Sequence, residues 1–399
     1  MPLSNIDTNH REQGEDEDSA ASSVFQSPSP PVPPSMNLDL SRYHRQTLLP
    51  GFGERGQEQL LGSRALILGC GALGTVSANL LARAGVGHLV IADRDFIEPT
   101  NLQRQVLFDE PDVEQGIPKA EAARQKIARI NSQVKVTALI EDVNHANIQE
   151  LARGCDVIVD GVDNFETRFL ANDAAVKWGV PYVYAGAVGT VGMTMVILPH
   201  TVEGSRPWEQ EGGGGATPCL RCIFEQAPPP GVNPTCETAG VLGPAVSVVA
   251  SFQAGEVLKI LTGNWAAVNR TMTSVDLWEN AIHQFKIASA YDAGTCPCCK
   301  ERSFEFLEGR FASGTTTLCG RNAVQLTQNL SNGTLDFDQI AQRLRAHGPV
   351  KANRFMVRAE LRDNNNPYEL TLFRDGRAIV KGTKEPSTAR SIYAKYVGG

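Results

Sequence analysis

A glycine-rich segment, Gly69-Cys-Gly-Ala-Leu-Gly74, is the first part of the sequence that indicates chemistry. It fits the pattern G-x-G-x-x-G and follows a short apolar run, Ala65–Leu68. Glycines let the backbone approach a phosphate closely, and the N–H groups at the start of a following helix attract the anion. Asp93 ends the next apolar run, where a carboxylate can bind ribose hydroxyls. These residues predict a nucleotide site and leave open whether it takes ATP or NAD.

The polar residues after Asp93 favour ATP. Asn101, Arg104 and Gln105 lie in this run, and Lys119 stands just inside a predicted helix. A triphosphate needs such residues, since arginine offers forked donors to phosphoryl oxygens, whereas a dinucleotide-dependent dehydrogenase does not. Asp163 follows another predicted strand, where open α/β sheets bind ligands, although it could instead cap the next helix.

The cysteines fall into two pairs of the form C-x-x-C, Cys219 with Cys222 and Cys296 with Cys299. Four thiolates arranged in this way favour a tetrahedral, structural Zn²⁺ site. Cys298 lies inside the second pair and is an alternative ligand, but the spacing of Cys296 and Cys299 mirrors the first pair. The total of nine cysteines is odd and no export signal is visible, so disulfides are not expected.

Cys236 stands apart from these pairs, in a stretch that precedes a predicted apolar helix from Pro244 to Leu261. A thiol near a helix N-terminus can have a lowered pKa and react as a nucleophile. A chemical role and an ordinary thiol are both compatible with the sequence.

The elements that must position these residues alternate between strand and helix. Apolar runs lie at 65–68, 88–92, 134–140 and 156–160, with helical patterns after the glycine-rich segment, at 119–130 and from Phe165 onward. This order predicts an α/β fold, a Rossmann-like and mostly parallel sheet with flanking helices. The uncharged window 179–198 contains Pro181 and four glycines, so we interpret it as two strands around a turn, of mixed direction, and not as a membrane helix.

Three regions follow from composition. Residues 1–40 are acidic and rich in Pro and Ser, and we expect them to be disordered. Residues 41–300 contain the predicted nucleotide-binding domain with its zinc site. Residues 303–399 are predicted to form a small C-terminal α+β module with helices near 336–347 and 387–396 and a hairpin around 374–376.

The charge of the chain argues against two kinds of partner. The formal net charge is −7, and seven acidic residues against one basic residue place −6 of it in residues 1–40, which leaves −1 for residues 41–399. No broad basic field favours nucleic acid, and no polybasic run favours a membrane surface. With no export pattern at the N-terminus, we expect a cytoplasmic protein.

Eight short segments together resemble the MoeB/ThiF family, which is related to the ubiquitin-activating enzymes. They are RYHRQ (42–46), GCGALG (69–74), the run DRD to NLQRQ (93–105), GIPK (116–119), VDN (162–164), PCLRC (218–222), TCETAGVLGP (235–244) and CPCC (296–299). They occur in the family's order and cover about 41–300. The module at 303–399 does not resemble the rhodanese domain that ends some relatives.

The resemblance implies ATP-dependent adenylation of the C-terminal glycine of a ubiquitin-like sulfur-carrier protein, for molybdopterin or thiamin biosynthesis, with Mg²⁺ and structural Zn²⁺. It implies that Gly69, Gly71 and Gly74 line the nucleotide and that Asp93 holds the ribose. Asn101, Arg104 and Lys119 are implied to hold phosphates, and Asp163 to act near Mg²⁺ and the reacting phosphate. Arg45 is implied to reach into the partner's site in a homodimer. In relatives, the cysteine at Cys236 is linked to attachment of the carrier or to sulfur transfer. An NAD-dependent oxidoreductase, a non-catalytic scaffold and a family enzyme with another substrate are the alternatives.

Overall fold

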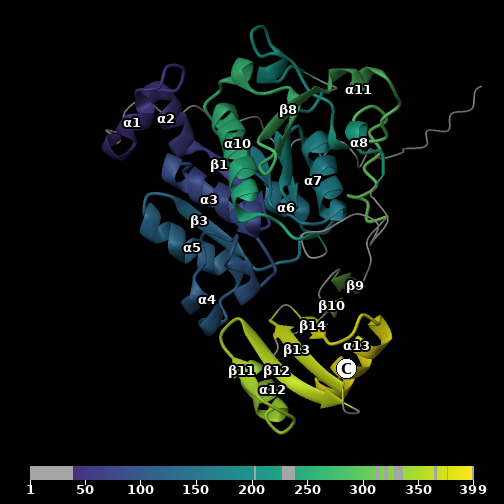
Figure 1. Cartoon of the computed structure of the whole chain (residues 1–399). Coiled ribbons are helices and arrows are strands. Elements are labelled where there is room, and N and C mark those ends of the chain that lie inside the picture. The colour runs from purple at the N-terminus through teal and green to yellow at the C-terminus, as the bar shows by residue number, and fades with distance from the viewer. Residues whose placement is uncertain are drawn as a thin grey trace, which may run out of the picture.

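The computed structural model describes residues 39–201, 204–226, 239–310, 315–318, 322–327, 336–363, 366–374 and 376–397. These residues form a larger α/β body and a smaller body built around a second sheet (Figure 1). Most of the tail predicted to be disordered, and also Cys236, lie outside the described residues.

The larger body is built on an eight-stranded sheet in the order β3-β2-β1-β4-β5-β6-β7-β8. The strands are β1 (Arg64–Leu68), β2 (His88–Ala92), β3 (Lys135–Leu139), β4 (Val157–Asp160), β5 (Tyr182–Val188), β6 (Val191–Ile197), β7 (Thr271–Asp276) and β8 (Ala281–Lys286). Strands β3 to β5 are parallel, and β6 to β8 continue the sheet in antiparallel pairs. The predicted Rossmann-like α/β fold is therefore confirmed.

Helices cover both faces of this sheet because side chains of the central strand are buried on both. In β1, Ala65 and Ile67 pack into one core, and Leu66 and Leu68 into the other. The first face carries α2 (Gly53–Gly62), α3 (Ala72–Ala84), α5 (Lys119–Ile130) and α10 (Gly243–Leu261), and the second α6 (Ile148–Ala152), α7 (Phe165–Trp178) and α8 (Leu220–Ile223). Shorter helices are α1 (His44–Thr47), α4 (Glu110–Gln115) and α11 (Ala288–Asp292), with 3₁₀ turns η2 (Ser41–Tyr43), η3 (Pro99–Asn101), η4 (Pro207–Glu209) and η5 (Trp265–Ala267).

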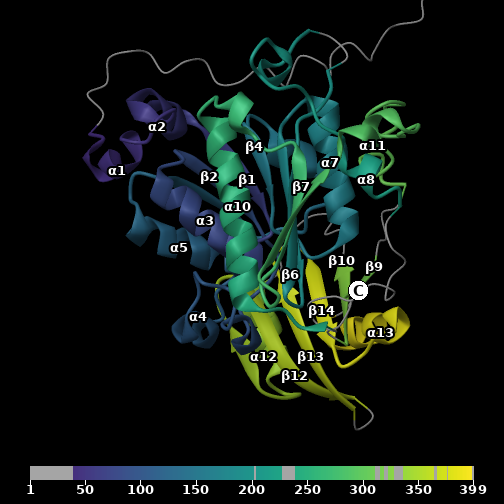
Figure 2. The same cartoon turned by 45° about the horizontal axis from the view of Figure 1, so that its top comes forward.

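Helix α10 is, among the described residues, the helix long and apolar enough to cross a membrane. It runs along the larger sheet beside α3 (Figure 2), and Val246, Val249 and Ala250 pack against residues of α3 and β5. Its apolar composition is therefore explained by burial in the core. The uncharged window at 179–198 forms the antiparallel pair β5–β6, as predicted.

The hairpin of β7 and β8 was not predicted from the sequence. Strand β8 lies at the edge of the sheet, and Ile282 and Phe285 on it are exposed. A strand without a buried face lacks the alternation of apolar and polar residues by which strands are predicted.

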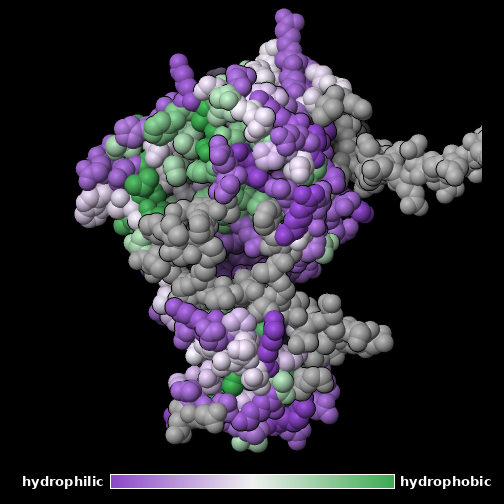
Figure 3. Space-filling model, turned by 90° about the vertical axis from the view of Figure 1, so that its right-hand side faces the viewer, coloured by the Kyte–Doolittle hydropathy of each residue, from purple (hydrophilic) through white to green (hydrophobic). Residues whose placement is uncertain are grey.

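Figure 3 shows hydrophobic side chains gathered on the larger body in this view, while the smaller body below is mainly hydrophilic.

The smaller body is an antiparallel sheet of six strands in the order β11-β12-β13-β14-β10-β9. Its elements are β9 (Thr315–Leu318), β10 (Ala323–Thr327), α12 (Phe337–Leu344), β11 (Val350–Ala352), β12 (Met356–Asp363), β13 (Asn366–Phe373), β14 (Arg377–Lys381) and α13 (Pro386–Tyr396). Apolar side chains of α12 and α13 pack with those of the sheet into one core. The two predicted helices and the predicted hairpin, β13–β14, are all present in this C-terminal module.

Candidate functional site

The glycine-rich loop joins β1 to α3 and packs tightly against the end of β4. Gly69 has a φ of +82°, which L-residues rarely adopt. A Cβ on Gly69 would lie 2.5 Å from the carbonyl oxygen of Gly161, and a Cβ on Gly74 would overlap the carbonyl oxygen of Gly69. These close approaches fix the loop, and with it the N-terminus of α3, at the carboxyl edge of the parallel strands.

Asp93, at the end of β2, points at this loop. Its Oδ2 accepts a hydrogen bond from the backbone N–H of Cys70 at 2.6 Å, and its Oδ1 accepts one from the N–H of Asp95 at 2.7 Å. Burial raises the pKa of Asp93, and the nearby Lys119 opposes this shift. The carboxylate therefore lies beside the glycine-rich loop, at the position expected for a ribose ligand.

Lys119 is the best-buried cation at this edge, with 3% of its surface exposed. Its Nζ lies 3.1 Å from Oδ2 of Asp95. Arg94 contacts the same carboxylate at 3.9 Å and lies 2.6 Å from Asp142. Burial disfavours the charge of Arg94, but the carboxylates of Asp142 and Asp95 outweigh it and raise the pKa. Cations and carboxylates thus alternate along this edge.

The segment from η3 onward carries Asn101, Arg104 and Gln105, and Gln105 is the one that contacts the glycine-rich loop. Asn101 is buried, and its Oδ1 accepts a hydrogen bond from the N–H of Glu98 at 3.0 Å. Arg104 donates from Nη1 to the carbonyl of Thr100 at 2.8 Å. Gln105 lies under the loop, because its Nε2 is 3.9 Å from the place that a Cβ on Gly71 would take. Its buried Oε1 has no hydrogen-bond partner among the described residues, which fits a group that meets a ligand.

Asp163 follows β4 and is exposed at the same edge. It lies close enough to Arg94 and Arg168 to help raise the pKa of each. The cap of α7 is Asn164, whose Oδ1 accepts a hydrogen bond from the N–H of Thr167 at 2.8 Å. The alternative that Asp163 caps this helix is therefore wrong.

A buried ion pair anchors the turn that carries Asp163. Nε of Arg168 lies 3.2 Å from Oδ2 of Asp160, and Nη2 donates to the carbonyl of Val162 at 2.9 Å. Tyr182 donates from its hydroxyl to the same Asp160 oxygen at 2.8 Å. Burial works against the charge of Arg168, but Asp160 outweighs it and raises the pKa. This pair was not predicted from the sequence, although an acidic residue at the end of a buried strand followed by an arginine in the first turn of the next helix was a signal.

Arg45 lies elsewhere, on the exposed side of the short helix α1. Its neighbour Gln46 donates to the carbonyl of Ala84, the last residue of α3. Because α3 spans 13 residues, this end lies about 20 Å from the glycine-rich loop. Arg45 is therefore far from the nucleotide edge of its own chain, the edge of the sheet that carries the glycine-rich loop, Asp93, Lys119 and Asp163.

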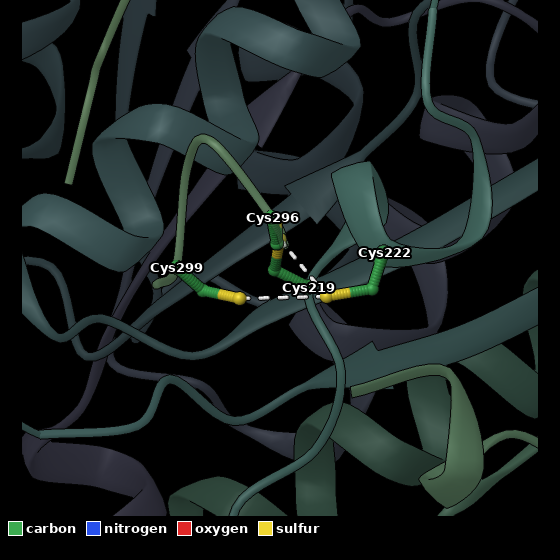
Figure 4. Close-up of side chains that lie close together, drawn as sticks. All are labelled: Cys219, Cys222, Cys296 and Cys299. Carbon is green, nitrogen blue, oxygen red and sulfur yellow. Dashed lines mark hydrogen bonds between the residues drawn. The ribbon is translucent and has the colours of Figure 1, made fainter. Parts of the chain in front are cut away.

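The four cysteines of the two C-x-x-C pairs come together on the α7 side of the sheet (Figure 4), with all Sγ atoms within 4.8 Å of one another. The Sγ of Cys219 lies 3.8 Å from that of Cys222 and 3.6 Å from that of Cys296, and Cys222 and Cys299 are 3.4 Å apart. Four sulfurs at 2.3 Å from a tetrahedral Zn²⁺ would be about 3.8 Å apart, so the cluster fits this ion. Cys298 is not a member of this group, and its Sγ accepts a hydrogen bond from Asn172 at 3.3 Å.

Comparisons with known proteins add family information to this geometry. A model described as the ThiF family matches residues 43–298. The chain is 43% identical over 359 residues to the sulfur carrier protein ThiS adenylyltransferase of Bacillus subtilis, covering 90% of this chain and 99% of the relative. It is 35% identical to the SAMP-activating enzyme E1 of Haloferax volcanii, over 69% of this chain and 95% of that one.

Among solved structures, that of E. coli MccB with ATP aligns with a TM-score of 0.52 and 24% identity, over 67% of this chain and 76% of the other. Likeness at this level of identity concerns the fold alone.

Proposed function

The chain belongs to the ThiF family, and on that premise we propose that it uses ATP to adenylate the C-terminal glycine of a ubiquitin-like sulfur-carrier protein. The name of the relative from Bacillus subtilis, which the chain matches over nearly its whole length, supports a carrier of the ThiS type. The product would be a carrier activated for sulfur transfer in thiamin or molybdopterin biosynthesis.

One observation carries this proposal: groups suited to ribose, phosphate and metal converge at the carboxyl edge of the parallel sheet. The glycine-rich loop, Asp93 and Lys119 are joined there by short contacts, and Asp163 is exposed beside them. Buried Lys119 and Gln105, with its unpaired Oε1, favour a triphosphate over the NAD-dependent alternative.

The chemistry follows from positioning and charge. A carboxylate oxygen of the carrier's last glycine attacks the α-phosphorus of ATP, the new O–P bond forms, and the bond to the β-phosphate oxygen breaks to release pyrophosphate. The attacking carboxylate is ionised at neutral pH, so no general base is needed. Asn101, Arg104 and Lys119 hold the phosphates and offset their charge. Asp163 suits Mg²⁺, which commonly binds one or two carboxylates together with substrate phosphates and stabilises their charge.

Arg45 supports a homodimer in this proposal. It lies about 20 Å from the glycine-rich loop of its own chain, the length of α3, so a partner subunit must bring it to a site. Mixing Arg45→Ala chains with Asp163→Ala chains should then restore exchange activity, because one site of the mixed dimer has both residues. Two inactive variants that stay inactive when mixed would contradict the shared site.

Zn²⁺ is the metal that we assign to the cysteine cluster, in a structural role. Cys219 and Cys222 flank the start of α8, and Cys296 and Cys299 follow α11, so the ion would join two distant segments. The cysteines of the described part are free thiols, which supports a reducing, cytoplasmic location. Cys236 stays a predicted chemical residue, to be tested in the sulfur-transfer step.

ATP–pyrophosphate exchange tests the proposal. The full chain is assayed with a panel of small proteins that end in Gly-Gly, and Asp163→Ala serves as the inactive variant. We expect exchange that depends on one carrier and falls at least about a hundredfold in the variant, the scale of losing a charge-stabilising group. If the protein binds ATP but none of the carriers supports exchange, the result would point to another adenylated substrate or to a scaffold.

A further inference from the structure

The C-terminal module is docked on the segment that carries the nucleotide ligands. Phe96, three residues after Asp93, packs on Phe373 of β13 with ring centroids 5.4 Å apart, and Met356 of β12 completes this buried cluster. Asn353 of the module donates from Nδ2 to the carbonyl of Gly116 at 3.0 Å. The contacts thus reach both the segment after β2 and the turn just before Lys119.

A polar chain runs from this module to Lys119. Gln325 of β10 donates from Nε2 to Oδ2 of Asp142 at 2.9 Å, and the other oxygen of Asp142 accepts from Arg94 at 2.6 Å. Arg94 contacts Asp95, which pairs with Lys119 at 3.1 Å. Gln325 is only 2% exposed, so its orientation is fixed by packing. The first link crosses from the module to the larger body, and the other links join charged side chains within the larger body.

A second contact reaches Asn101 from the other side. Lys381 of β14 lies 2.6 Å from a carboxylate oxygen of Glu98. The same carboxylate accepts the backbone N–H of Asn101, while the side chain of Asn101 accepts the N–H of Glu98. Lys381 therefore holds one half of the reciprocal cap that orients Asn101.

We propose that the C-terminal module is a built-in part of the triphosphate site, in which Gln325 and Lys381 position Lys119 and Asn101 for the phosphates. Gln325 orients Asp142 so that Arg94 stays with it, and Asp95 is left to hold Lys119 at the loop. Without this amide, Arg94 can turn away from Asp142 and pair with Asp95 or Asp163. The charges that face the phosphates would then change. The inference rests on the proposed function, since it takes Lys119 and Asn101 as phosphate ligands.

Binding measurements on the full chain test this role. Gln325→Leu and Lys381→Met are compared with two control variants in the same module, Gln339→Leu, an exposed residue of α12, and Lys395→Met, whose ion pair with Asp363 stays within the module. Dissociation constants of ATP and adenosine are measured by calorimetry together with thermal unfolding. We expect ATP affinity to fall about tenfold in each interface variant, the scale of one charge-assisted hydrogen bond, with adenosine affinity and both controls unchanged.

The split between ATP and adenosine separates positioning from general damage. Equal losses for ATP and adenosine, or unchanged ATP affinity, would overturn the inference. Lys381→Arg keeps the charge and should bind ATP within about twofold of the parent protein, because a guanidinium can also pair with Glu98. Since no carrier takes part in these measurements, they stand apart from the exchange assay: absent exchange would remove the proposed function, and unchanged ATP affinity would remove the role of the module.

Discussion

The cysteine cluster and the nucleotide edge both gather residues that are distant in sequence, but they do so in different ways. The cluster brings together four like groups within 4.8 Å, an arrangement that suits a metal ion. The nucleotide edge instead pairs charged groups with partners of the same chain: Asp93 with the backbone N–H of Cys70, Lys119 with Asp95, and Arg94 with Asp142. The first arrangement suits a bound metal ion, and the second suits a charged ligand that replaces one partner of a pair.

This difference predicts the largest effect on stability at the cluster. Cys296→Ser should release zinc and lower the free energy of unfolding by roughly 5 kcal/mol or more, since metal binding to such sites is coupled to folding. Metal content and thermal unfolding measure the change. Cys298→Ser is the matched control, because its Sγ contacts Asn172 and lies outside the cluster. Loss of zinc in the Cys298 variant, with retention in the Cys296 variant, would reverse the assignment.

The stability of the protein should be nearly as sensitive to an added side chain in the glycine-rich loop. In Gly74→Ala the new methyl group overlaps the carbonyl oxygen of Gly69, so we expect a loss of about 2–4 kcal/mol in stability together with weak ATP binding. Gly255→Ala in α10 is the control, because a Cβ there meets nothing within 4 Å. It should stabilise the protein by about 0.5–1 kcal/mol, as alanine does in helices. A Gly74 variant as stable as the parent would contradict the tight packing of the loop.

Exchange of partners at the nucleotide edge is tested by Lys119→Met. Loss of this charge should weaken ATP about thirtyfold, near 2 kcal/mol, with a smaller change in thermal unfolding. Lys126→Met is the control on the same helix, since Lys126 pairs with Asp109 and Asp112 and not with the site residues. If both variants bind ATP alike, Lys119 is only a structural partner of Asp95.

The smallest effect is expected at His88, which lies at the other end of β2 from Asp93 and belongs to neither region. Burial, with Arg64 and Lys135, lowers the pKa of His88 to about 4, whereas an unfolded histidine titrates near 6.5. The unfolded state therefore binds the proton first, and stability falls as the pH drops from about 6.5 toward 4.

Because His88 is only partly buried, solvent reduces this loss to less than about 1 kcal/mol. His88→Gln should lose less stability than the parent protein between pH 7 and pH 5 in denaturant unfolding. An equal loss in the two proteins would place the pH dependence at other groups.

The sequence predicted the parts of this fold that depend on local pattern. β2 and α5 have the predicted bounds because a short apolar run and a helical period lie between clear breaks. The grouping of Cys219 and Cys222 with Cys296 and Cys299 followed from their spacing and agreed with the family resemblance, and the four sulfurs lie together. Gln105 and Asp163 were recognised as members of polar segments, although only the structure places them at one edge.

The features that were not predicted from the sequence depend on contacts between segments far apart in the chain. Strand β8 is exposed and carries no alternation, and the contact of Gln325 with Asp142 joins residues that no local pattern relates. The Asp160–Arg168 pair is likewise visible only once α7 is packed on the sheet. Sequence reasoning therefore found the candidate ligands of the nucleotide and missed the residues that hold them in place.

The most direct measurement of the central claim is the intact mass of the carrier protein after incubation with this protein, ATP and Mg²⁺. The proposal predicts a carrier that gains one adenylyl group at its C-terminal glycine, with release of pyrophosphate, and no such product with Asp163→Ala. A carrier that binds the protein and remains unmodified, while ATP is bound at the glycine-rich loop, would contradict adenylation of that class of substrate.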